Sequence, residues 1–127
     1  MTLNPSQEPA VHAGPVRRFK QPDYLEVAPT LGDLRQKIDA LDEQIVALLA
    51  QRALCVKDAT RFKRDAFQVA APARQAQVFQ RIRHLCEAHA ASFPGFADVV
   101  EASYRTLVAG FIAGEKDLFD ITEEIRS

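Results

Sequence analysis

Two cations fall where the apolar face of a helix should be. Apolar residues from Leu34 to Leu48 recur at spacings of three and four, which is the period of one helical stripe. Continued at the same spacings, this stripe reaches Arg52 and then Lys63. Lys and Arg are almost never fully buried unless they are paired, so these cations must meet an anion. That anion is either a carboxylate of the protein or a ligand.

Helical geometry relates the cations to one another. Arg52 and Lys63 are eleven residues apart, so one helix would place them on the same face, about 16 Å apart along its axis. Arg35 comes seventeen residues before Arg52, which is about 25 Å away along the same helix. Two antiparallel copies of the helix would bring Arg35 of one chain toward Arg52 of the other. Guanidinium groups suit bidentate carboxylate binding, so the spacing predicts a shared pocket for a small dicarboxylate.

A purely structural interpretation uses the same residues. Glu115 lies four residues beyond Phe111, on or beside the apolar stripe of a later helix. Arg52 could pair with Glu43 or Glu115 in a structural network, while the amine of Lys63 reaches water. The spacing alone does not separate this network from a binding site.

The element that positions these cations is one very long helix over residues 30–67. It contains no Pro and no Gly after its first turn, and Thr30 is its expected N-cap, with Asp33 at the positive end of the helix dipole. The helix should end within residues 64–71, because Pro72 excludes the α conformation at the residue before it. About 35 residues would extend roughly 50 Å, longer than a domain of this size is wide, so a second copy should cover part of the stripe.

Two more helices follow by their apolar spacing. The second should start at Pro72 and end before Phe93, and the third should run from about Gly95 to about Asp120. Within the third helix Gly110 and Gly114 each cost about 1 kcal/mol relative to Ala, which predicts close approach of a helix or ligand there. There are no strand signals, so we expect an all-α chain of three helices.

Composition limits the domain organisation and the class of partner. Residues 1–29 hold five of the seven prolines and predict a flexible arm before a helical domain of residues 30–127. A net charge of −1 does not indicate the excess of positive charge that nucleic-acid binding favours. No apolar stretch of the sequence suits a signal peptide or a membrane span. We therefore expect a soluble cytoplasmic protein. Cys55 and Cys86 fall on apolar helical positions, which predicts buried reduced thiols and no metal site.

The long helix carries a recognisable pattern. The run LRQKIDALDEQIVALLAQR, continuing to VKDATRFK, resembles the all-helical (class II) chorismate mutase family, which includes the related isochorismate pyruvate lyase. The motif L-x-x-[LI]-R-x-x-[IV]-D-x-[LI]-D, an Arg seventeen residues after the motif's Arg and a Lys eleven after that are matched without a gap. The resemblance covers roughly Leu31 to Phe119. It implies an intertwined homodimer that rearranges chorismate to prephenate without a cofactor or a covalent intermediate.

The resemblance also implies roles for individual cations. Arg35 matches the arginine given to the partner's pocket, and Arg52 matches the arginine that grips a substrate carboxylate. Lys63 matches the lysine that donates to the breaking ether oxygen and to a carboxylate. Arg74 matches a second-helix arginine that approaches a substrate carboxylate.

Three positions depart from the family pattern. The pattern D-x-x-R-E at the second helix is here Ala71-Pro72-Ala73-Arg74-Gln75, so Ala71 and Gln75 replace two acids and leave the substrate's ring hydroxyl with a weaker acceptor. Glu115 stands where many members have a glutamine that donates to the ether oxygen. An ionised carboxylate cannot donate, so we expect Glu115 to be protonated when the protein is active, with its pKa raised by burial. The alternative is an ion pair between Glu115 and Lys63.

Three functions remain open on the sequence. Chorismate mutase is the first expectation. Elimination of pyruvate from isochorismate to give salicylate is the second, and the stretch VKDATRFK with its nine-residue step from Lys63 to Pro72 favours it. A non-catalytic helical dimerisation or sensor module is the third, favoured by Ala71 and Gln75.

Overall fold

The computed structural model describes residues 8–125, and these residues contain helices and irregular segments but no strand. The long helices are α1 (Leu31–Ala59), α3 (Pro72–Glu87) and α4 (Phe96–Asp120). A short helix, α2 (Ala66–Ala70), and two 3₁₀ turns, η2 (Thr60–Phe62) and η3 (Ala90–Ser92), lie between them. The predicted all-α class with three long helices is confirmed, and α2 is an addition that was not predicted.

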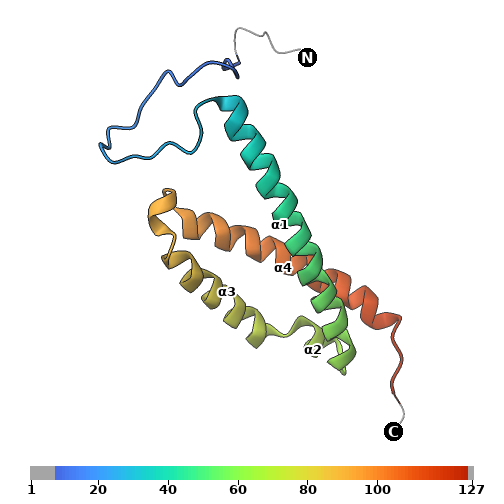
Figure 1. Cartoon of the computed structure of the whole chain (residues 1–127). Helices are drawn as coiled ribbons and strands as arrows, with labels where there is room; N and C mark the ends of the chain where they lie inside the picture. The colour runs from blue at the N-terminus through green and yellow to red at the C-terminus, as the bar shows by residue number, and fades with distance from the viewer. Residues whose placement is uncertain (1–7, 126–127) are drawn as a thin grey trace. The chain divides into compact units, whose positions relative to one another are not determined.

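The chain divides into two compact units, and the boundary falls within α1, between Ala50 and Gln51. In the second unit α3 packs along α4, and α2 and η2 also contact α4 (Figure 1). The buried apolar side chains Val69, Cys86 and Val108 form the core of this unit. Two buried polar residues, Thr60 and Glu115, complete the buried set. The core therefore lies where α2, α3 and η2 meet α4.

Surface charges join α3 to α4 outside this core. The guanidinium of Arg83 on α3 donates to Asp98 at 3.1 Å and to Glu101 at 3.3 Å, both on α4. The Arg105 guanidinium of α4 lies 4.3 Å from the ring centroid of Phe79 on α3. Exposed ion pairs contribute little individually, so these contacts mainly fix the register of the two helices.

In the first unit the start of α1 is capped as predicted. The backbone N–H of Asp33 donates to Thr30 Oγ1 at 3.1 Å, which satisfies one of the free donors of the first helical turn. The N–H of Gly32 donates to the carbonyl of Val11 at 3.0 Å, and a Cβ on Gly32 would lie only 3.1 Å from that oxygen. The described part of the arm, residues 8–29, forms no helix. The first seven residues of the predicted arm and the last two of the predicted helical domain lie outside the described residues.

The end of α1 corrects a prediction. The helix was expected to end within residues 64–71, but it ends at Ala59, and Thr60–Phe62 continue as a 3₁₀ turn. Lys63 then adopts extended backbone angles, φ −101° and ψ 138°. Lys63 is therefore not on the long helix, and the axial spacing of about 16 Å that was calculated for a continuous helix does not apply.

A local capping signal explains why the helix ends early. Asp65 is the N-cap of α2, and its Oδ1 accepts the N–H of Gln68 at 2.9 Å. The Gln68 side chain in turn accepts the N–H of Arg64 at 2.7 Å. This reciprocal arrangement is a variant of the capping box, which starts a new helix and sets its direction. The Asp65-x-x-Gln68 spacing is a capping signal that the sequence itself carries.

One further expectation is wrong within the described chain. Cys86 is buried as predicted, but Cys55 is exposed, and both thiols are free. A side chain added at Gly110 or Gly114 would meet nothing within 4 Å among the described residues, so no helix of this chain approaches them closely, and the approach of a ligand or of a second chain stays a prediction. None of the helices in residues 8–125 combines the length and apolarity needed to cross a bilayer.

Candidate active site

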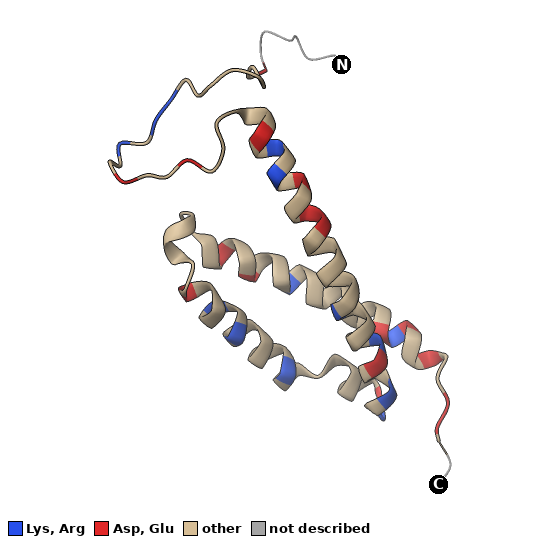
Figure 2. Cartoon of the chain, in the orientation of Figure 1, with Lys and Arg blue, Asp and Glu red and all other residues tan. Residues whose placement is uncertain are grey.

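A cavity of about 290 Å³ lies in the second unit, between the last turns of α1, the segment through α2, the first turn of α3 and the second half of α4. Its apolar wall includes Val78, Val108, Phe111 and Ile112. Five polar residues that the sequence had singled out also line it: Arg52, Lys63, Arg74, Gln75 and Glu115. Figure 2 shows that Lys and Arg recur along α3 and gather near the end of α1. The cavity therefore combines an apolar wall with several cations and one acid.

Arg52 projects from the second part of α1. Its guanidinium carbon lies 5.7 Å from the ring centroid of Tyr104 on α4, a cation–π distance. Arg52 forms no ion pair within residues 8–125, which does not support the structural network with Glu43 or Glu115. The aromatic ring holds the guanidinium in place without neutralising it, so the charge stays available to an anion.

Lys63 follows η2 and is half-buried. Its backbone N–H donates to the carbonyl of Thr60 at 3.1 Å, which ties the residue to the preceding 3₁₀ turn. In the described part of the chain Lys63 has no carboxylate within ion-pair distance. The alternative of a direct Lys63–Glu115 ion pair therefore finds no support.

Glu115 is a buried acid on α4, with 7% of its surface exposed. Its Oε2 accepts a hydrogen bond from the hydroxyl of Thr60 at 3.4 Å. Burial raises the pKa of Glu115, while the positive charge of Lys63 and the Thr60 hydrogen bond each lower it, and burial is the largest effect. This upward shift of the pKa agrees with the expectation that the Glu115 carboxyl keeps its proton to a higher pH than an ordinary glutamate does.

Arg74 and Gln75 lie in the first turn of α3, which starts at Pro72. Ala71, just before it, has a left-handed backbone with φ 45° and is both the C-cap of α2 and the N-cap of α3. Gln75 Nε2 donates to the carbonyl of Ala70 at 2.6 Å, which anchors the amide to the end of α2. The amide oxygen of Gln75 remains as a possible acceptor on the cavity wall.

Arg35 is not part of this cavity. It lies in the first unit, on the exposed surface near the start of α1, and it is absent from the cavity lining. The single chain therefore brings together five of the six predicted site residues. A role for Arg35 in a neighbouring chain's pocket stays a prediction.

Sequence reasoning missed Thr60 entirely. Thr60 is 2% exposed, and its hydroxyl contacts a carboxyl 55 residues away in the chain. No periodic signal marks such a contact, because it depends on how η2 packs against α4. No local sequence signal marks Thr60 apart from its place five residues before Asp65, the N-cap of α2.

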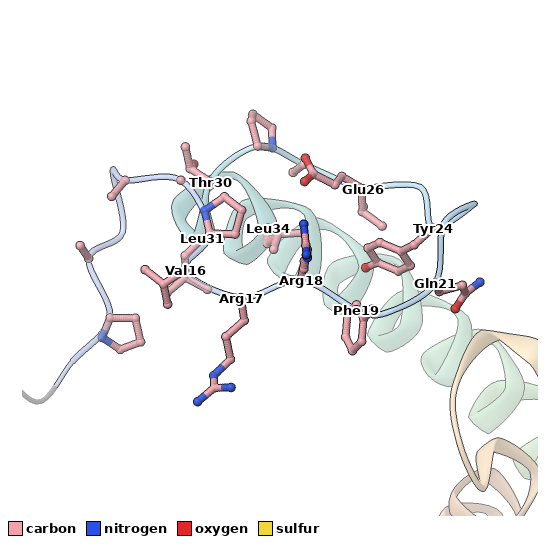
Figure 3. Close-up of a pocket in the computed structure, with 18 of the residues that line it drawn as sticks. Val16, Arg17, Arg18, Phe19, Gln21, Tyr24, Glu26, Thr30, Leu31 and Leu34 are labelled. Carbon is pink, nitrogen blue, oxygen red and sulfur yellow. The ribbon is translucent and has the colours of Figure 1, made fainter.

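A larger cavity of about 900 Å³ lies in the first unit, between the arm and the start of α1 (Figure 3). On its wall the ring centroids of Phe19 and Tyr24 lie 4.9 Å apart. The side chain of Arg18 points into the space that the arm encloses, and that of Arg17 points away from it. Val16 and Phe19 are 97% and 68% exposed, and no buried polar side chain lines this space. We therefore assign the chemistry to the smaller cavity.

The charge of the smaller cavity defines the ligand it can hold. Arg52, Lys63 and Arg74 contribute three positive charges, and Glu115 contributes none when it is protonated. Such a site favours a small dianion with an apolar body, and its volume is near the lower limit of about 300 Å³ for small-molecule pockets. No group of three or more His, Cys, Asp or Glu side chains able to hold a metal occurs within residues 8–125.

Comparisons with known proteins point the same way. Residues 34–116 match the family described as chorismate mutase type II, and this segment contains all six predicted site residues. A chorismate mutase from Methanocaldococcus jannaschii is 35% identical to the chain over 60 residues. That alignment covers 46% of this chain and 61% of the archaeal protein.

Proposed function

Because the chain belongs to the chorismate mutase type II family, we propose that it catalyses the pericyclic rearrangement of chorismate to prephenate. The observation that carries this proposal is the convergence of Arg52, Lys63, Arg74, Gln75 and Glu115 on one cavity. These residues come from α1, the segment after η2, α3 and α4, so only the folded unit assembles them.

The reaction needs little from the protein beyond positioning and charge stabilisation. The substrate must be held in the chair-like conformer, and donors must face the ether oxygen, where negative charge grows as the carbon–oxygen bond breaks. In our proposal Arg52 and Arg74 bind the two substrate carboxylates. Lys63 and protonated Glu115 donate to the ether oxygen from the cavity wall, and the amide oxygen of Gln75 accepts from the ring hydroxyl.

We further infer that the active form is a homodimer with shared pockets. Along the first part of α1 the apolar side chains Ile38, Leu41 and Ile45 are each more than half exposed in the single chain. A second copy would cover this face, and Arg35 on the same segment would then reach the partner's cavity. Residues 30–127 would form the catalytic domain, with residues 1–29 as an appended arm. The two free cysteines suit a reducing compartment, so we propose a cytoplasmic location.

Pyruvate elimination from isochorismate is the second candidate. The two reactions act on isomeric dicarboxylates and would use nearly the same binding groups. The feature in its favour is the stretch VKDATRFK with its nine-residue step from Lys63 to Pro72. Neutral Ala71 and Gln75 on the cavity wall also offer the ring hydroxyl a weaker acceptor than the mutase pattern does.

Single substitutions test whether this cavity is the site. We expect Arg52→Ala and Lys63→Ala each to lower kcat/KM for chorismate by about a hundredfold or more, as removal of one oxyanion donor does elsewhere. Arg61→Ala is a matched control, because Arg61 is an exposed cation in η2 that pairs with Asp58 and does not line the cavity. Circular dichroism checks that each variant folds.

Two results would contradict the proposal. Wild-type protein that binds dicarboxylates but turns over no chorismate would favour the non-catalytic module. Equal losses in Arg61→Ala and Lys63→Ala would show that general charge, and not this cavity, supports the rate.

A further inference from the structure

The hydroxyl of Thr60 is the single hydrogen-bond partner of the Glu115 carboxyl in the described chain. Thr60 is 2% exposed and begins η2, where α1 ends. Its Oγ1 lies 3.4 Å from Glu115 Oε2 and 3.3 Å from the carbonyl oxygen of Val56. A hydroxyl has one proton, so Thr60 can donate to only one of these oxygens at a time.

The two oxygens of Glu115 have different surroundings. Oε2 accepts from Thr60, while Oε1 has no hydrogen-bond partner among the described residues. No buried side-chain nitrogen or oxygen in residues 8–125 lacks a partner, so Oε1 must retain accessible surface. Glu115 also lines the cavity where a ligand would bind. The carboxyl is therefore held at one oxygen and available at the other.

We propose that Thr60 is a positioning residue for Glu115, and that its donation to Oε2 leaves Oε1 to carry the proton toward the bound substrate. This inference rests on the proposed function, in which neutral Glu115 donates to the ether oxygen. A neutral carboxyl has one donor oxygen and one acceptor oxygen. When Thr60 donates to Oε2, that oxygen is the acceptor, so the proton resides on Oε1 and the donor points into the cavity.

A competing arrangement would be unproductive. If Oε2 carried the proton, it would donate to Thr60, and the Thr60 hydroxyl would turn to the Val56 carbonyl. Oε1 would then present only lone pairs to the cavity and could not stabilise a developing oxyanion. A substrate ether oxygen beside Oε1 favours the productive arrangement, because only that one forms the additional hydrogen bond.

Charged neighbours act on the same carboxyl. The titratable or charged residues that line the cavity with Glu115 are Arg52 and Cys55 from α1, Lys63 after η2 and Arg74 from α3. Lys63 favours the ionised form of Glu115, and so does the Thr60 hydroxyl that donates to it. Removing the Thr60 hydroxyl should therefore leave the Glu115 carboxyl less well oriented. It should also, as a separate effect, raise the pKa of Glu115 further. A side chain that only filled space would produce neither effect.

Thr60→Val tests the inference, because it keeps the side-chain shape and removes the hydroxyl. We expect the limiting kcat/KM at low pH to fall about three- to tenfold, the usual effect of one hydrogen bond. We also expect the fall in kcat/KM with rising pH to begin at higher pH than in the wild type. Thr60→Ser keeps the hydroxyl and should restore both properties.

Glu115→Gln provides a background in which no carboxyl titrates. There the Thr60 hydroxyl would hold the amide oxygen and direct the amide N–H₂ into the cavity. We expect Thr60→Val to lower kcat/KM again by about three- to tenfold in this background, now without any change in the pH profile.

A measurement without substrate separates failure of this inference from failure of the proposed function. The ¹³C shift of the Glu115 carboxyl can be titrated in ligand-free wild type and Thr60→Val, with Glu115→Gln identifying the signal. A higher pKa in Thr60→Val supports the hydrogen bond even if no chorismate turns over. An unchanged pKa, or a limiting kcat/KM that is equal or higher in Thr60→Val, overturns the inference while leaving mutase activity intact.

Discussion

The chemistry proposed for this cavity can be tested most clearly at Glu115. A carboxyl beside a lysine would usually be ionised, yet burial raises the pKa of Glu115 more than Lys63 and Thr60 lower it. Glutamine at this position would donate at every pH, whereas glutamate donates only while protonated. If Glu115 donates to the substrate as proposed, glutamate at this position makes transition-state stabilisation dependent on pH.

The sign of this dependence follows from the protonation state. In the proposed mechanism the protonated form is the active one, so kcat/KM should be constant at low pH and fall as pH rises through the raised pKa of Glu115. Glu115→Gln should remove this fall and give a flat profile over the same range. Steady-state rates with chorismate across pH measure both. A flat wild-type profile, or an identical fall in Glu115→Gln, would show that another group controls the rate.

At the scale of the element, the short connection between α1 and α3 decides where Lys63 and the cavity wall lie. The apolar period correctly predicted where α1, α3 and α4 begin, because each start carries a strong local signal such as Thr30 or Pro72. It did not predict where α1 ends, because the residues after Ala59 keep apolar spacing while the Asp65 cap starts a new helix.

The same distinction applies to the site. Five of the six predicted residues share one cavity, because their types were unusual for their places in a helical pattern. Thr60 was not predictable in this way, since threonine at a helix end is ordinary. Its contact with Glu115 appears only when η2 packs against α4. The charged residues of the site could be predicted from the sequence, whereas Thr60, which we propose orients Glu115, could not.

The cap of α2 provides a prediction at this scale. Asp65→Ala removes the acceptor of the Gln68 N–H, and loss of such a cap costs about 1 kcal/mol. Because α2 carries buried Val69 and borders the cavity, we also expect kcat/KM to fall. Asp117→Ala is the control, since Asp117 is an exposed acid that caps no helix. Chemical denaturation and chorismate turnover measure the two effects, and equal behaviour of both variants would contradict the role of the cap.

At the scale of the whole molecule, the first part of α1 is the feature that the single chain leaves unexplained. No residue of α1 is buried within the described chain, although its apolar side chains follow one stripe. Full burial of an exposed aliphatic side chain contributes roughly 1.5–3 kcal/mol, and Ile38, Leu41 and Ile45 remain about half exposed, so a partner surface is the expected solution. A homodimer would supply that surface and would bring Arg35 to a second cavity.

Subunit mixing tests the shared pocket. Arg35→Ala and Arg52→Ala should each be inactive alone, because every pocket of either homodimer lacks one arginine. In a mixed dimer one pocket would lack both arginines and the other would be intact, so exchange should restore up to about half of the wild-type activity per mixed dimer. Sedimentation and mass analysis of tagged subunits verify the exchange. No recovery after verified exchange would place Arg35 outside the partner's pocket.

The most direct measurement is turnover of the two candidate substrates by the unmodified protein. Chorismate and isochorismate would be supplied separately, and prephenate and salicylate would be quantified in each reaction. We predict rapid formation of prephenate from chorismate, with little salicylate from isochorismate. Negligible prephenate beside fast release of salicylate and pyruvate would contradict the assignment as a mutase and identify the second candidate reaction as the one this cavity performs.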